Sequence, residues 1–147
     1  MFNCRLITPT ACVLDEPVTY ASIPAWDGLF GILPGRAPIV AKLGLGELHL
    51  KFPDRDGAKG GTRSYLVEDG FVQMIGDKLT ILAAQATPAE SITLTEAKAE
   101  LKEAEARHVP EGADDATAQR KQISTQLARS RAKVRIAQKF REHGGAI

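Results

Sequence analysis

The sequence feature that most constrains the fold is the stretch of residues 24–38, which holds three glycines, three prolines and five large apolar residues in fifteen positions. Within it, Pro34 and Gly35 stand where a type II turn needs proline and glycine, because glycine takes up positive φ at little cost. Apolar residues close to the glycines predict a short buried strand between two bends: Phe30, Ile32 and Leu33. The glycine spacing matches neither a dinucleotide-binding fingerprint nor a phosphate-binding loop. The stretch alone therefore predicts a corner in a β domain.

Residues 1–89 have the pattern of short strands separated by turn residues. Phe2, Cys4 and Leu6 alternate with polar neighbours, which is typical of a strand with one buried face. Further strands are predicted at 11–14, 18–23, 39–43, 47–52, 64–67, 70–75 and 78–84, with a turn-like break at 15–17. Residues 53–61 predict an exposed loop, and Gly76 with Asp77 predicts a tight hairpin. Short, regularly interrupted strands predict an antiparallel β-sandwich or flattened barrel as a first domain, 1–89.

The hydrophobic period changes after Ser91, where apolar and small residues begin to recur at helical spacing. The first stripe consists of Leu94, Ala97, Leu101, Ala104 and His108, and the second of Ile123, Leu127, Ser130, Val134 and Ala137. Thr93 and Glu96 predict a capping box at the start of the first helix, and residues 109–112 predict its end. Two helices joined by a short polar linker predict an antiparallel hairpin over 90–147, so the predicted fold class is α+β with strands before helices.

Both helical stripes consist largely of small or polar residues. The hairpin therefore buries few methylene groups, each of which contributes about 0.8 kcal/mol. An element held this weakly separates from the body, or opens, at modest cost. The stripes thus favour a mobile arm, and the alternative is a helical cap that never moves.

The net charge of +1 conceals an uneven distribution along the chain. Residues 1–89 carry −1, residues 90–116 carry −5 and residues 117–147 carry +7. Five basic residues of the second helix fall within about a third of a turn: Arg120, Lys121, Arg131, Arg135 and Lys139. Such a face is a solvated surface or a contact for nucleic acid or an anionic membrane. The helix has one aromatic residue, Phe140, and an apolar side without tryptophan, so neither a nucleic-acid partner nor direct membrane insertion is predicted.

No catalytic or metal-binding constellation is recognisable in the sequence, so a non-catalytic protein without a cofactor is predicted. The three histidines form no ligand spacing: His49, His108 and His143. Cys4 and Cys12 lie in apolar, strand-like contexts, which predicts buried free thiols in a reducing compartment rather than a disulfide or a metal pair. No apolar run approaches a membrane span, and no signal or transit segment is recognisable.

Residues 27–38, Asp-Gly-Leu-Phe-Gly-Ile-Leu-Pro-Gly-Arg-Ala-Pro, closely resemble a loop-and-strand motif of the epsilon subunit of the F-type ATP synthase. Similar matches at 65–72 and 79–83 extend the resemblance over nearly the whole chain. The family commonly has histidine where Arg36 stands and glycine where Asp69 stands, and aspartate tolerates left-handed backbone better than most residues. The resemblance implies a non-catalytic rotor subunit that links the γ subunit to the c-ring for proton-driven ATP synthesis and restrains ATP hydrolysis.

The resemblance also implies three contacts, position by position. The bend at Asp27, Gly28 and Leu29 matches the family's surface on the membrane ring of c subunits. Arg36 matches the position that faces the γ subunit. The basic face of the second helix would meet an acidic segment in the catalytic α/β head, through Arg120, Lys121, Arg131, Arg135 and Lys139.

One family feature is missing. Some bacterial members hold ATP through an Ile/Leu-Asp-x-x-Arg-Ala signature at the start of the first helix. Here Thr93 stands in place of the aspartate and Glu96 in place of the arginine, and a carboxylate repels phosphate, so ATP binding is not predicted.

The resemblance favours a bacterial or plastid protein, peripheral on the cytoplasmic face of the bacterial inner membrane or on the thylakoid. The alternative function is a free β-sandwich adaptor whose basic helix binds an acidic protein or nucleic acid.

Overall fold

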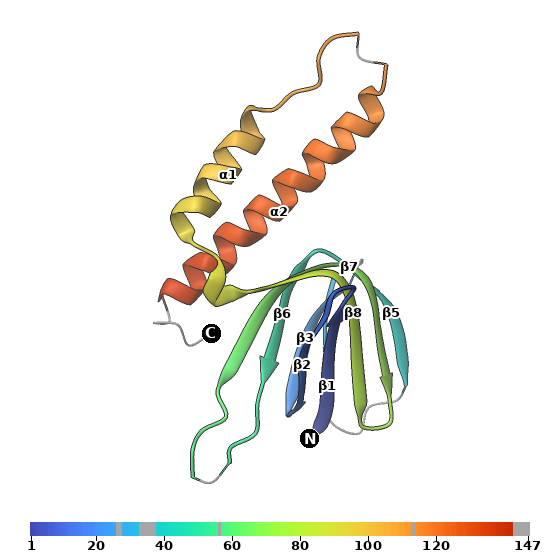
Figure 1. The fold of residues 1–147 in the computed structure, drawn as a ribbon, viewed down its shortest axis with the longest axis vertical. Coiled ribbons are helices and arrows are strands. Elements are labelled where there is room, and N and C mark those ends of the chain that lie inside the picture. Colours follow the sequence, from blue (N-terminus) through green and yellow to red (C-terminus); the bar gives the residue numbers. More distant parts are fainter. Residues whose placement is uncertain (26–27, 33–37, 56, 113, 143–147) are drawn as a thin grey trace.

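The structure is a computed structural model that describes residues 1–25, 28–32, 38–55, 57–112 and 114–142. The predicted α+β order is confirmed, because strands occupy the first part of the chain and helices the second (Figure 1). The strands are β1 Phe2–Thr8, β2 Ala11–Val18, β3 Tyr20–Ala25, β4 Gly28–Ile32, β5 Ile39–Leu43, β6 Gly46–Lys51, β7 Thr62–Ile75 and β8 Lys78–Pro88. A short 3-10 turn, η1 Ala89–Ser91, leads into the helices α1 Leu94–Ala106 and α2 Ala116–Glu142. Pro34 and Gly35, which predict the type II turn, lie outside the described residues.

The strands form a β-sandwich in which neighbouring strands follow the order β2-β1-β8-β7-β5-β3-β4, with β6 between β3 and β7. The predicted antiparallel sandwich is confirmed, and among the described strands one pair, β1 with β8, runs parallel. The core lies between the two layers, and the predicted alternation in β1 is confirmed because Phe2, Cys4 and Leu6 are all buried. Ile32 is fully buried and Phe30 packs against the core, as predicted for the short strand β4.

The predicted break at residues 15–17 is wrong, because β2 continues through it to Val18. Among the described strands, β2 pairs only with β1 and forms an edge of the sheet, which is where proline is tolerated within a sheet. The charged residues that suggested a turn are instead partly exposed and paired with neighbouring side chains. Asp15 accepts a hydrogen bond of 2.7 Å from Asn3, and Glu16 pairs with Arg63 at 2.8 Å.

The strands predicted at 64–67 and 70–75 are two halves of one strand, β7, joined by a bend at Asp69 and Gly70. Both residues have positive φ, 53° and 142°, and a Cβ built on Gly70 would lie 1.7 Å from the Leu82 carbonyl oxygen. Opposite the bend, the partner strand is interrupted between β5 and β6, so the first half of β7 pairs with β6 and the second half with β5. Only glycine fits the second position of this bend.

The pairing of β7 with β8 keeps its register across the bend, yet the buried face changes. Before the bend, Tyr65 and Val67 point into the core, whereas after it Val72 and Met74 do. Their neighbours in sequence therefore lie on the outer surface in both halves. The tight hairpin predicted at Gly76 and Asp77 joins the end of β7 to β8 as expected.

The helices form the predicted antiparallel hairpin, which projects from one end of the sandwich (Figure 1). Small residues of both stripes are buried at the contact between the helices: Ala97, Ala104, Ser130 and Ala137. The stripe of the first helix ends earlier than predicted, because α1 stops at Ala106 and His108 is exposed. Thr93 is the N-cap residue, but its side chain makes no capping hydrogen bond, so the predicted capping box is wrong. The Thr93 carbonyl oxygen instead accepts the first helical bond from Ala97, at 2.9 Å.

Candidate interaction surfaces

The start of β4 exposes an apolar side chain to solvent. Gly28 opens the strand with φ 135°, and Leu29 beside it is 71% exposed, as the sequence predicts for this bend. Asp27, the third residue of the predicted c-ring contact, lies outside the described residues, as does Arg36, the predicted γ contact. The side chain of Leu29 is not needed for the core and is therefore available to a partner.

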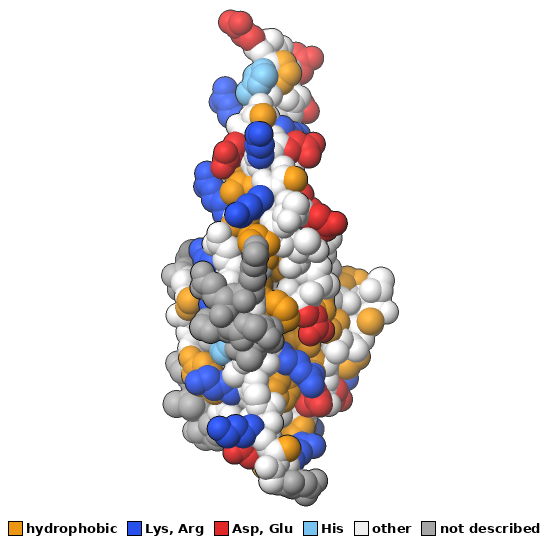
Figure 2. All heavy atoms as spheres, turned by 90° about the vertical axis from the view of Figure 1, so that its left-hand side faces the viewer, with side chains coloured by type: hydrophobic (Ala, Val, Ile, Leu, Met, Phe, Trp, Pro, Cys, Tyr) orange, Lys and Arg blue, Asp and Glu red, His pale blue; other side chains and the backbone are white. Residues whose placement is uncertain are grey.

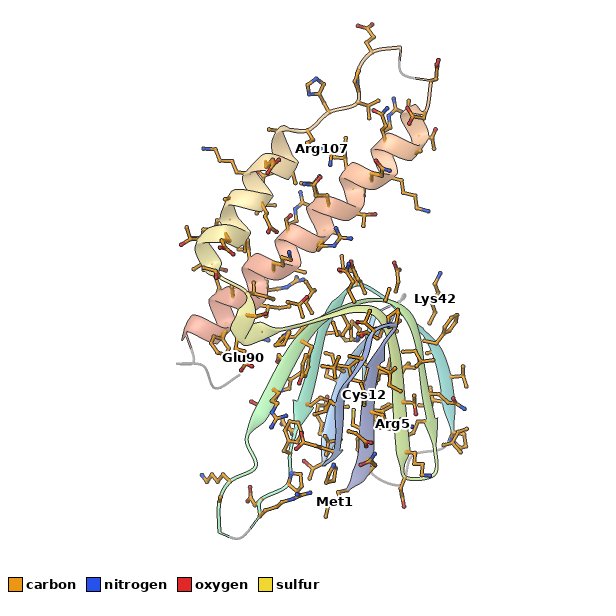
Figure 3. All side chains as sticks on the ribbon, viewed as in Figure 1. Met1, Arg5, Cys12, Lys42, Glu90 and Arg107 are labelled. Atoms are coloured by element: carbon orange, nitrogen blue, oxygen red, sulfur yellow. The ribbon has the colours of Figure 1, made fainter. Side chains whose placement is uncertain are left out.

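A larger apolar area lies on the outer face of β5, β7 and β8, which we call the bare surface. It consists of Val40, Phe71, Ile75 and Leu82, which are between 48% and 74% exposed. The register places Phe71 directly beside Leu82 on one side and Lys42 on the other, so these side chains share one face. Figure 3 labels Lys42 on β5, at the rim of this face. Sequence reasoning missed the bare surface because it assumes a regular alternation of inward and outward side chains. The backbone bend at Asp69 and Gly70 reverses this alternation.

The outer face of the first half of β7 is not exposed to solvent, because α2 covers it. Ala132 and Ile136 of α2 are buried against Leu66 of β7 and Ala89 of η1, and Phe140 packs at the edge of this cluster. Ala132, Ile136 and Phe140 recur every four residues and form a second stripe on α2, beside the one that faces α1. The sequence contains this signal, but it is masked by the basic residues between its members.

Two ion pairs flank this apolar contact and join α2 to the sandwich. Arg129 Nε lies 3.0 Å from Glu68 Oε2 of β7, and Lys139 Nζ lies 2.8 Å from Glu47 Oε1 of β6. Glu68 is only 7% exposed, so its charge is largely removed from water while α2 is docked. A third pair, Lys133 with Glu100 at 3.1 Å, lies within the hairpin and joins α2 to α1. The docked position of α2 is thus defined by a small apolar cluster with a charge pair on either side.

The five predicted basic contact residues do not share one environment. Four of them are exposed: Arg120, Lys121, Arg131 and Arg135. Lys139 is half-buried and forms an ion pair with Glu47. Figure 2 shows Lys and Arg side chains together with Asp and Glu side chains along the hairpin, so this view of it carries both signs of charge. At the end of the hairpin far from the sandwich, Arg107 donates a hydrogen bond to Gln126 and ties the two helices together (Figure 3).

Two large hollows adjoin α2 in the part of the chain that the structure describes. One, of about 720 Å³, lies on the hairpin and is lined by four cations: Arg107, Lys121, Arg129 and Lys133. Arg129 and Lys133 are already paired with carboxylates. With Glu96 exposed at the start of α1, the absence of tight ATP binding stays a prediction.

The other hollow, of about 680 Å³, lies where α2 meets β3, β4 and β6, and we call it the basal hollow. Its lining includes Leu29, Glu47, His49, Lys51, Arg135 and Lys139. His49 Nδ1 lies 2.9 Å from the Ser64 hydroxyl oxygen, and burial lowers the pKa of His49. His49 is therefore neutral near pH 7 and adds no charge to the hollow.

The two cysteines differ, although both are free. Cys4 is buried as predicted, and this burial, with Asp15 nearby, raises the pKa of its thiol to about 12. Cys12 is exposed, so the prediction that both thiols are buried is wrong for Cys12, which lies on the edge strand β2. Within the described ranges, no group of three or more His, Cys, Asp or Glu side chains could hold a metal ion. Neither described helix is both long and apolar enough to cross a membrane.

A family comparison decides the kind of protein that presents these surfaces. The family model for the β-sandwich domain of the ATP synthase delta/epsilon chain matches residues 1–89, which are the whole sandwich. The chain belongs to the ATP synthase delta/epsilon chain family. The predicted resemblance is thereby confirmed, and the matched residues contain both the Leu29 bend and the bare surface.

Individual members of the delta/epsilon chain family match both parts of the molecule. An ATP synthase epsilon chain of Nitratidesulfovibrio vulgaris is 35% identical over 135 residues, which cover 90% of this chain and 94% of that protein. The epsilon chain of Bacillus velezensis is 37% identical over 127 residues, covering 86% and 91%. A chain in the cryo-EM structure of the Euglena gracilis mitochondrial ATP synthase has the same fold, with a TM-score of 0.68 at 24% identity, covering 86% of this chain and 76% of that one.

Proposed function

We propose that this chain is a non-catalytic subunit of the central stalk of an F-type ATP synthase, where it links the γ subunit to the c-ring and restrains ATP hydrolysis. The observation that carries the proposal is the bare surface on a sandwich whose core is already complete. Large apolar side chains that are exposed in the isolated chain mark a surface that a partner covers. Membership of the delta/epsilon chain family supports the ATP synthase as the assembly that supplies this partner.

The γ subunit is the proposed partner of the bare surface. Arg36, which the family resemblance assigns to the γ contact, precedes β5 by three positions in sequence, and β5 contributes Val40 to the bare surface. The exposed area is apolar at its centre and has Lys42 and Lys78 at its rim. An apolar centre with a polar rim is the usual composition of a stable protein interface.

The c-ring is the proposed partner of the bend at Asp27, Gly28 and Leu29. Support comes from the exposure of Leu29 and from its place on a short strand held by β3, which presents the side chain rigidly. The chain would then be peripheral, on the cytoplasmic face of a bacterial membrane, which agrees with the bacterial origin of its epsilon-chain relatives.

The helical hairpin is the proposed restraint on hydrolysis. Its contact with the sandwich involves few large side chains, which supports a part that leaves the sandwich at modest cost. We propose that the exposed cations of α2 then meet acidic residues of the catalytic head, and that Lys139 joins them once it has left Glu47. The alternative of a free adaptor protein is not favoured, because family membership and the bare surface both support a subunit of the ATP synthase.

Co-purification with the γ subunit and the behaviour of a shortened chain test this function. The full chain should co-purify with the γ subunit, whereas a free adaptor would not. A chain ending at Ser91 should still unfold cooperatively and bind γ, because the sandwich core contains no residue from α1 or α2. ATPase activity of the assembled enzyme should rise with the shortened chain and fall with the full chain. Loss of cooperative unfolding in the shortened chain would contradict the division at residues 89–90.

A further inference from the structure

His49 of β6 lies where the sandwich meets α2, and it lines the basal hollow. Its Nδ1 is 2.9 Å from the Ser64 hydroxyl oxygen of β7. A hydroxyl donates to a neutral ring and accepts from a protonated one, so Ser64 suits both states of His49 and the surrounding charges decide between them. Among the described residues, the hollow has five other titratable or charged side chains: Tyr20 of β3, Glu47 and Lys51 of β6, and Arg135 and Lys139 of α2.

Glu47 is the neighbouring carboxylate on the same face of β6, since alternate residues of a strand point to the same side. It is already engaged, because Lys139 Nζ lies 2.8 Å from one of its oxygens and 3.1 Å from the other. Burial lowers the pKa of His49; Glu47 opposes this effect, and Lys139 and Lys51 add to it. The docked helix thus occupies the single described carboxylate of the hollow that could stabilise a positive His49.

The charges that matter for docking are those of α2, because the charges of the sandwich are present whether α2 is docked or released. This holds for Asp27 too, although it lies outside the described residues. Among the described lining residues, α2 contributes two charged side chains to the hollow, Arg135 and Lys139, and both are cations. Its last two residues, Arg141 and Glu142, whose side chains are not described, carry one charge of each sign. The docked helix therefore brings an excess of positive charge to the hollow.

Release of α2 has three effects on His49, all in the same direction. It removes the cations of the helix, it returns the ring to water and it frees the Glu47 carboxylate from Lys139. Each of these changes stabilises the imidazolium relative to the neutral ring. Protonation of His49 therefore favours the released hairpin.

We propose that Glu47 and His49 form a proton-sensitive latch for α2, in which protonated His49 displaces Lys139 from Glu47 and the hairpin leaves the sandwich. In the docked arrangement Glu47 pairs with Lys139 and His49 is neutral. In the released arrangement Glu47 pairs with the imidazolium, which has taken one proton from water. The consequence for catalysis rests on the proposed function: a fall in pH frees the hairpin and so increases its restraint on ATP hydrolysis.

The direction of the pH dependence follows from linkage between protonation and docking. Since His49 binds its proton more weakly while α2 is docked, docking is strongest above the pKa of the released state, about 6.5 for an ordinary histidine, and weakens as the pH falls below it. Carboxyl groups ordinarily titrate at about pH 4, below this window. The chain has two further histidines, His108, which is exposed, and His143, which lies outside the described residues. These two residues are the ones that a control must exclude.

Hydrogen exchange of the α2 amides in the full chain tests the latch, with protection factors compared at about pH 7.5 and about pH 5.5. Protection around Ile136, which contacts the sandwich, should fall roughly three- to tenfold at the lower pH, at tenfold for each pH unit between the docked and released pKa values of His49. His49→Gln keeps a polar side chain but takes up no proton, so it should abolish this dependence. The matched control is the double variant His108→Gln with His143→Gln, which should keep it.

NMR titration of the His49 ring gives a second measurement that needs no change at His49. Lys139→Gln removes a cation that faces the ring and the partner that occupies Glu47, so it should raise the pKa of His49. An unchanged pKa of His49 in this variant would overturn the latch, even if His49→Gln failed to fold.

The remaining outcomes separate the latch from the proposed function. The same fall in protection in His49→Gln as in the unaltered chain, or its disappearance in the double histidine control, would overturn the latch. In the assembled enzyme, a lower pH should reduce ATPase activity further with the unaltered chain than with His49→Gln. If α2 is released in the free chain but both enzymes respond to pH alike, the latch stands and the restraint on hydrolysis by the hairpin fails.

Discussion

The two halves of β7 pair with β8 in one register, yet one outer face is covered by the chain itself and the other is bare. In residues 62–68 the outer face holds Leu66 and Glu68, which α2 covers. In residues 71–75 it holds Phe71 and Ile75, which contact solvent. The bend at Asp69 and Gly70 separates the halves. One strand therefore has one half that is covered within the chain and another half that is open to the partner that we propose.

The composition of the two faces differs in a way that indicates how permanent each contact is. The covered face combines a few apolar side chains with a charge pair on either side, Arg129 with Glu68 and Lys139 with Glu47. Both charges of such a pair regain water when the helix leaves, so the pair directs docking without strengthening it much. The bare face presents larger apolar groups, whose burial contributes about 25 cal/mol per Å² and is lost entirely on separation. The difference suits a reversible arm on one half and a lasting partner on the other.

The largest effect is expected at the bend itself. Gly70→Val should destabilise the sandwich by roughly 3 kcal/mol or more, because a side chain there meets the Leu82 carbonyl oxygen and the backbone has positive φ. Gly76→Ala is the matched control, since Gly76 also has positive φ but no atom lies within 4 Å of the position that a Cβ would take. This variant should lower the free energy of unfolding by only about 1 kcal/mol. Urea unfolding measures both. Similar losses in the two variants would show that the bend does not depend on close packing at Gly70.

The second largest effect should separate the two faces. Phe71→Asp should leave the unfolding free energy within about 0.5 kcal/mol of the unaltered chain, because the side chain is exposed. It should weaken binding to the γ subunit about 30-fold or more, as loss of an interface anchor does. Leu66→Asp makes the same change on the covered face and should release α2 while leaving γ binding intact. If Leu66→Asp also abolished γ binding, the two halves of β7 would not be independent surfaces.

This contrast also explains which parts of the molecule the sequence could predict. Alternation with period two revealed β1, and the 3.6-residue stripes revealed the hairpin, because each pattern depends on neighbours close in sequence. The bare surface depends on the left-handed backbone at Asp69, which reverses the alternation without changing the pairing. The pair of Arg129 with Glu68 joins residues 61 positions apart, and no local pattern indicates such a contact.

A smaller effect is expected from the cations of α2. Changing the four exposed ones, Arg120, Lys121, Arg131 and Arg135, to alanine should raise ATPase activity of the assembled enzyme by about tenfold, at about 0.2–1 kcal/mol for each exposed pair. Alanine keeps the helix, so the comparison isolates charge. Lys139→Ala belongs in a separate variant, because it also removes the pair with Glu47 that holds α2 on the sandwich.

Added salt should relieve the same inhibition in part, since exposed charge pairs are screened. A steric wedge formed by the apolar side of α2 would withstand both the salt and the fourfold change. An ATPase rate that stays constant in the fourfold variant would therefore favour the wedge and contradict a role for charge.

The smallest effect should come from Glu68→Gln, which keeps the shape of the side chain and removes its charge. The variant should weaken docking of α2 by about 1 kcal/mol, roughly fivefold, because Glu68 is nearly buried and meets Arg129 at 3.0 Å. Hydrogen exchange of the α2 amides measures this release, and the unfolding of the sandwich should not change. Glu100→Gln is the matched control, since its partner Lys133 lies within the hairpin and no contact with the sandwich is lost. Faster exchange in both variants alike would mean that hairpin stability, rather than docking on β7, governs the position of α2.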